Sequence, residues 1–172
     1  MITANLTAPF HPVRTGIGRD AAIALSGGIL CALVAVAITH RLATAGHLLP
    51  SDVNPWLVVH LGSVLPALPL GAYVLVRLKG DRRHWLLGRL WAALMLATAL
   101  SSFGLKDMTG GFSWIHLLSI VTLVSVPRSV VMAIRGNIPA HMRGMRIVYG
   151  ALVIAGAFAF MPGRFLGAWL FG

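Results

Sequence analysis

The chain has 172 residues, of which 58% are hydrophobic and only 10% are charged. Soluble domains carry roughly 25% charged residues, so this composition cannot cover a water-facing globule, and its apolar content also excludes intrinsic disorder. Fourteen basic and four acidic residues give a net charge of +10. The basic residues lie between apolar runs, where a lipid bilayer as partner explains them and nucleic-acid binding is not expected.

Five apolar segments are long enough to cross roughly 30 Å of hydrocarbon as helices. A polar segment, 1–20, precedes them and lacks the features of a cleaved signal peptide, so the first apolar run is expected to stay as a membrane span. The sequence therefore predicts an all-α fold, a polytopic transmembrane bundle of about five helices that forms a single membrane domain over 1–172. The predicted helices are 21–40, 55–76, 85–105, 112–134 and 142–161.

Basic residues gather in alternate connections between these helices. By the positive-inside rule, such connections face the cytoplasm. This places the N-terminus in the cytoplasm and the C-terminus outside, which in a bacterium means the inner (plasma) membrane. The residues that set this orientation are Arg14, Arg19, Arg77, Lys79, Arg82, Arg83, Arg135, Arg143 and Arg146.

Small residues let helix backbones approach one another in lipid. Prolines inside a helix bend it, and Pro66, Pro69 and Pro127 are expected to kink the second and fourth helices. Close packing of helices is predicted at the following glycines: Gly27, Gly28, Gly62, Gly71, Gly88, Gly150 and Gly156.

Four of the seven histidines form two depth-matched pairs. His60 lies about one and a half turns into the second predicted helix and His116 about one turn into the fourth, which runs in the same direction. These two imidazoles therefore share a depth near the outer face. His84 and His141 begin the third and fifth helices and share a depth near the cytoplasmic face. The other three histidines are interpreted as surface residues: His11, His40 and His47.

An imidazole inside a transmembrane helix is uncommon and usually functional. Two imidazoles at matched depth can supply both axial ligands of a haem inside a helix bundle. The pattern predicts one or two haems b, with ligands His60, His116, His84 and His141. Haem propionates need cations nearby. Candidates at the inner site are Arg82, Arg83, Arg128, Arg143 and Arg146, and at the outer site Lys106 and Arg164.

Simpler interpretations of the histidines stay open at this point. His84 and His141 also fit ordinary interfacial residues, and His60 and His116 fit interhelical hydrogen bonds, which stabilise membrane bundles modestly. All four also suit a proton relay or the ligation of copper or zinc. No catalytic set is evident, and no carboxylate falls inside a predicted helix. That argues against most proton-coupled transporters.

The stretch from His60 to Arg164 resembles an uncharacterised bacterial integral-membrane family, the domain-of-unknown-function family DUF2306. This resemblance covers the second to fifth helices, about two-thirds of the chain, and leaves the first helix as an addition. The family name carries no assigned activity. The motifs that support the resemblance are PWLVVHLG with His60, HWLLGRLW from His84, GFSWIHLLS around His116 and GNIPAHMRGMRIVYG around His141.

The layout is also similar to the di-haem cytochrome b561 superfamily. In that superfamily a core of four helices carries one ligand pair on its first and third helices and the other pair on its second and fourth. The resemblance implies that His60 and His116 bind one haem b and that His84 and His141 bind the other. This chain departs from the superfamily in lacking an ascorbate-binding signature.

The expected function is a b-type haem-binding membrane protein that carries electrons across the bilayer, as a carrier or as a subunit of a redox complex. If it is an enzyme, it is a transmembrane oxidoreductase. The alternative is a cofactor-free accessory subunit or assembly factor of a larger membrane complex. A small transporter or metal-handling protein is a third hypothesis.

Overall fold

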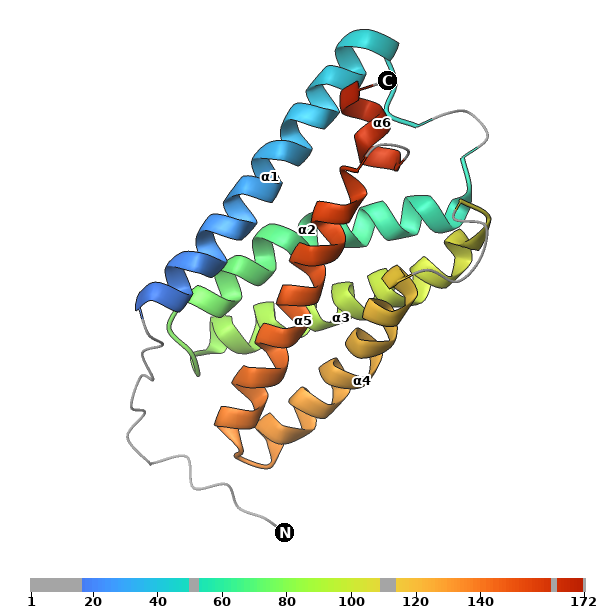
Figure 1. The fold of residues 1–172 in the computed structure, drawn as a ribbon. Coiled ribbons are helices and arrows are strands. Elements are labelled where there is room, and N and C mark those ends of the chain that lie inside the picture. The colour runs from blue at the N-terminus through green and yellow to red at the C-terminus, as the bar shows by residue number, and fades with distance from the viewer. Residues whose placement is uncertain (1–16, 50–52, 109–113, 162–163, 172) are drawn as a thin grey trace.

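The computed structural model describes residues 17–49, 53–108, 114–161 and 164–171 (Figure 1). Every regular element in these ranges is helical, and five of the helices are long and apolar enough to cross a membrane. This confirms the all-α fold and the expected five spans. In chain order the elements are α1 (Ile17–Ala45), α2 (Pro55–Val76), α3 (Arg82–Ser102), the 3₁₀ helix η1 (Phe103–Met108), α4 (Trp114–Ile134), α5 (Ile138–Ala159) and α6 (Phe165–Phe171).

Three helices begin earlier than their apolar patterns indicated: α1 begins at Ile17 rather than at 21, and polar side chains cap the other two, α3 and α5. The Asp81 carboxylate accepts a hydrogen bond from the backbone N–H of His84 at 2.7 Å, which starts α3 at Arg82 rather than at 85. Asn137 accepts from the N–H of Ala140 at 3.1 Å and starts α5 at Ile138 rather than at 142. His84 and His141 therefore lie inside the first helical turns.

Four of the helices form a closed ring. Neighbours around this ring are α2 and α3, α3 and α4, α4 and α5, and α5 and α2. It follows that α2 lies diagonally opposite α4, and α3 opposite α5. Helix α1 packs outside the ring against α2 and α5, and the short α6 lies against the C-terminal part of α1 (Figure 1). We call the end where α3 and α5 begin the basic end, and the end where α2 and α4 begin the opposite end.

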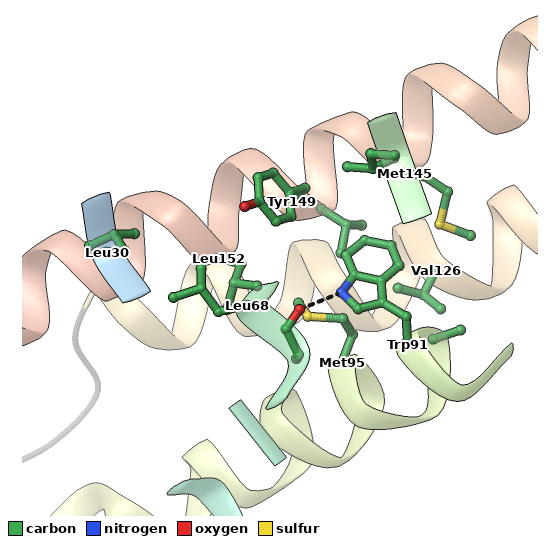
Figure 2. Packing of buried hydrophobic residues seen from close by; sticks show 12 residues of the cluster. Leu30, Leu68, Trp91, Met95, Val126, Met145, Tyr149 and Leu152 are labelled. Atoms are coloured by element: carbon green, nitrogen blue, oxygen red, sulfur yellow. Dashed lines mark hydrogen bonds between the residues drawn. The ribbon is translucent and has the colours of Figure 1, made fainter. Parts of the chain in front are cut away.

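The apolar core lies where α2, α3 and α5 meet. Trp91 is only 1% exposed, and its indole Nε1–H donates a hydrogen bond to the backbone carbonyl of Ala67 at 3.0 Å (Figure 2). The Tyr149 ring is 6.4 Å from the Trp91 ring between centroids. These two aromatic side chains, together with Leu68 and Met95, fill the middle of the bundle between its two ends.

Close helix packing at glycine is observed at only some of the predicted positions. A Cβ atom at Gly71 would lie 2.5 Å from Trp91 Nε1 and 2.8 Å from Tyr149 Cδ2. Gly27 and Gly156 also face neighbouring side chains. The prediction is wrong at four positions, where an added Cβ atom would meet no atom of a neighbouring helix within 4 Å in the part of the chain that the structure describes: Gly28, Gly62, Gly88 and Gly150. Pattern alone does not say which side of an apolar helix a glycine occupies.

Substitution of Gly71 by alanine is expected to destabilise the bundle. The added methyl group would push Trp91 and Tyr149 out of contact, and overpacking of this kind costs about 1–3 kcal/mol. Gly62→Ala is the matched control, since it lies in the same helix and faces open space. Thermal unfolding in detergent, followed by circular dichroism, measures both variants. Equal stability of the two would contradict the packing role of Gly71.

Candidate functional site

A cavity of about 240 Å³ lies in the half of the bundle towards the opposite end, and both His60 and His116 line it. These residues come from diagonally opposed helices, so the first predicted histidine pair meets at one cavity. Most of the wall is aliphatic: Leu57, Leu61 and Leu65 of α2, Leu30 and Val34 of α1, and Leu152 and Ala155 of α5.

The His60 ring is held by the neighbouring helix α3. Its Nδ1 lies 3.1 Å from the backbone carbonyl oxygen of Thr98 and 3.2 Å from the Ser101 hydroxyl. A carbonyl only accepts, so Nδ1 carries the proton and, in the neutral ring, Nε2 keeps its lone pair. Metal-binding histidines are typically fixed in this way through their second nitrogen. His116 is 4% exposed, and the Phe103 ring is 5.6 Å from it between centroids.

Buried hydroxyl groups of α2, α3 and α4 form a polar band beside the cavity. The Thr98 hydroxyl donates to Ser63 Oγ at 3.0 Å, which links α3 to α2. The hydroxyls of Ser102 and Ser119 are 2.7 Å apart and link α3 to α4. Sequence reasoning missed this band, although Thr98 and Ser102 lie one helical turn apart on α3. The band lets the polar rings of the histidines lie among polar groups inside an otherwise apolar wall.

Helix α6 contributes Leu166 to the wall of the cavity, and the sequence did not predict this helix because seven residues are too few to span a membrane. Arg164, the residue before α6, lines the cavity, as expected for a cation near the outer histidine pair. The side chain of Lys106, the other cation expected there, lies outside the described residues. His40, interpreted as a surface residue, is exposed but donates from Nδ1 to the Trp169 carbonyl at 2.7 Å. His40 thus ties α1 to α6.

The second histidine pair lies at the basic end. The His141 Nδ1–H donates to the backbone carbonyl of Ser129 in α4 at 2.9 Å, which again leaves Nε2 as the free lone pair. His84 lies close enough to His141 for the two imidazoles to interact electrostatically. Its Nδ1 is buried and has no hydrogen-bond partner among the described residues. An unsatisfied buried polar atom is costly and calls for a partner.

Of the five arginines predicted around this pair, only Arg146 is half-buried, and it interacts electrostatically with Lys79. Arg82, Arg83, Arg128 and Arg143 are exposed on the surface of the basic end.

Two cations of the α2–α3 connection lie nearer to His84. Lys79 and Arg77 both act on His84 electrostatically, and Arg77 forms an ion pair with Asp81 at 2.5 Å. The ammonium group of Lys79 donates to the Leu75 carbonyl at 2.8 Å. Burial lowers the pKa of Lys79, Asp20 opposes that change and Arg146 adds to it. Sequence reasoning assigned these two residues to topology alone.

Each histidine pair offers two imidazoles, which is the number of axial ligands that a haem iron can take from the protein. Protein zinc sites use three or four side-chain ligands, and the described residues contain no group of three or more His, Cys, Asp or Glu side chains that could hold a metal ion. Haem iron takes only its axial ligands from the protein. The cavity at His60 is smaller than the about 300–1,000 Å³ of common ligand pockets, so its apolar walls must move apart to admit a macrocycle.

Comparisons of the chain with protein-family models, with curated proteins and with solved structures find no match.

We expect His40→Ala to loosen the packing of α6 beside the cavity, because His40 holds the Trp169 carbonyl. The variant loses one hydrogen bond worth about 1 kcal/mol, which corresponds to an about fivefold larger open population. Maleimide labelling of Arg164→Cys, in a Cys31→Ala background, measures this as a labelling rate. His47→Ala is the control, because the exposed His47 ring bonds to the Ala45 carbonyl two residues away and, among the described residues, to no other element. An unchanged rate in His40→Ala would show that the apolar contacts of α6 suffice.

Proposed function

We propose that the chain is a b-type haem-binding protein of the bacterial inner membrane that carries electrons across the bilayer, as a carrier or as a subunit of a redox complex. One observation carries this proposal: the two diagonals of the helix ring hold two histidine pairs, one towards each end. In each pair one imidazole has its Nδ1–H on a backbone carbonyl of the adjacent helix. The likeness of the histidine layout to that of the cytochrome b561 superfamily is in line with the same proposal.

His60 and His116 would hold one haem b at the cavity, with Arg164 and Lys106 near its propionates. His84 and His141 would hold the other at the basic end, where Arg146 is the inward-facing cation and the exposed arginines 82, 83, 128 and 143 lie around it. The bound haem supplies one-electron chemistry. The chain supplies the axial ligands, their tautomers and a low-dielectric surrounding.

The spacing of the two sites suits transfer across the membrane. Helix α3 carries both His84 and Thr98, whose carbonyl holds His60. They are fourteen positions apart, which corresponds to about 21 Å of helix, roughly two-thirds of the hydrocarbon thickness of about 30 Å. The proposed orientation, with the basic end in the cytoplasm, then places one site near each face of the bilayer.

The first test is a dithionite-reduced minus air-oxidised absorption spectrum of the purified protein, with haem quantified per chain. We expect b-type bands, with His60→Ala and His116→Ala each removing the haem at the cavity and His84→Ala and His141→Ala each removing the other. Haem content should therefore fall to about half in every single variant, because each haem loses an axial ligand.

His47→Ala is the matched control, since His47 is an exposed histidine outside both pairs. A colourless protein after expression with ample haem, recovered only with partner subunits, would reject the cytochrome and favour the accessory-subunit hypothesis. Stoichiometric copper or zinc in haem-free protein would favour metal handling instead. Unchanged haem content in the His60 and His116 variants would remove the assignment of the cavity site.

A further inference from the structure

Helices α4 and α5 approach each other closely at one point near the basic end. A Cβ atom at Gly144 of α5 would overlap the Ser129 hydroxyl of α4 and lie 3.1 Å from the Ser129 Cβ. Ser129 is 3% exposed, so its side chain is enclosed where the two helices meet. The two helices can keep this separation only because residue 144 has no side chain.

This contact lies beside a candidate ligand. His141 precedes Gly144 by three residues and therefore lies on the same face of α5, one turn nearer the basic end. The atom that receives the His141 Nδ1–H, at 2.9 Å, is the backbone carbonyl oxygen of Ser129 itself. The hydrogen bond that fixes the His141 tautomer thus depends on the same helix separation that Gly144 permits.

We propose that Gly144 is a positioning residue for His141: by letting α5 approach Ser129, it fixes the His141 ring with Nε2 directed to serve as an axial ligand at the basic end. The part concerning the ligand rests on the proposed function, whereas the part concerning the ring rests on the packing alone. The cavity site is insulated from this contact, because His116 lies thirteen residues from Ser129, about 20 Å along α4.

Gly144→Leu tests the proposal, with Gly150→Leu as the matched control. Gly150 lies in the same helix, and nothing lies within 4 Å of its Cβ position. The haem content of Gly144→Leu should fall to about half, and the remaining haem should then depend on His60 and His116. Gly150→Leu should keep the wild-type content. Equal losses in both variants, or no loss in Gly144→Leu, would overturn the role of Gly144 in haem binding.

Three variants with smaller changes in side-chain size cover the case in which Gly144→Leu does not fold. Gly144→Ala meets chiefly the Ser129 hydroxyl, so removal of that hydroxyl should relieve the overlap. We expect Gly144→Ala to lower occupancy at the basic end, Ser129→Ala to leave it unchanged, and the double variant to regain it. A double variant no better than Gly144→Ala would contradict the contact.

A second readout separates failure of this proposal from failure of the haem hypothesis. Nitrogen NMR of ¹⁵N-histidine-labelled, dithionite-reduced protein reports which ring nitrogen of His141 carries the proton. The wild type should show a hydrogen-bonded Nδ1–H that is lost in Gly144→Leu and kept in Gly150→Leu, whether or not haem is present. A wild type without haem but with this pattern would reject the proposed function and keep the positioning role. An unchanged His141 signal in Gly144→Leu would reject the positioning role itself.

Discussion

A buried imidazole in a membrane has no water to bond, so its ring N–H must find a partner in the protein. The arrangement of the four ring helices depends on this constraint. His60 and His141 each donate from Nδ1 to a main-chain carbonyl of the adjacent helix, at Thr98 and Ser129. A carbonyl already bonded within its helix still has a second lone pair, so the helices lose nothing by accepting these donors. Each donation fixes a tautomer and joins two helices.

The apolar middle of the bundle separates the two polar ends. Trp91 and Tyr149 fill this region against the bare backbone of Gly71, and the indole N–H is satisfied by the Ala67 carbonyl. Close packing here excludes water between the ends. The cations at each end are therefore local to that end, Arg164 at the cavity and Lys79, Arg77 and Arg146 at the basic end, and they favour an anionic group beside them. Changes at one end should affect the other only weakly.

Apolar length and histidine spacing predicted much of this fold, because both are properties of sequence distance along a helix. Five spans, and the matched depths of His60 with His116 and of His84 with His141, follow from the rise per residue. Rotation about each helix axis does not follow, since these helices are apolar nearly all round. For that reason the glycine contacts were only partly right, and the exposed positions of the arginines around the basic end were not foreseen.

Contacts made by short polar groups were missed for a related reason. The hydroxyl band at Thr98 and Ser119, and the pairing of Gly144 with Ser129, involve residues that are common in membrane helices and carry no signal alone. Only the ring geometry brings them beside the histidines. The capping signals at Asp81 and Asn137, by contrast, were readable in the sequence and would have placed His84 and His141 inside their helices.

The elements outside the ring have a physical role that the ring alone cannot supply. All four candidate ligands lie on α2 to α5, yet Leu30 and Val34 of α1 and Leu166 of α6 complete the wall of the cavity. Without them, the cavity beside His60 and His116 would lack the part of its wall that α1 and α6 supply. Helix α1 is held to the ring by its contacts with α2 and α5, and α6 is held to α1 by the His40 ring and the Trp169 carbonyl. The added helices therefore complete the wall of the cavity site, and α1 also contributes at the basic end, where Asp20 acts electrostatically on Lys79.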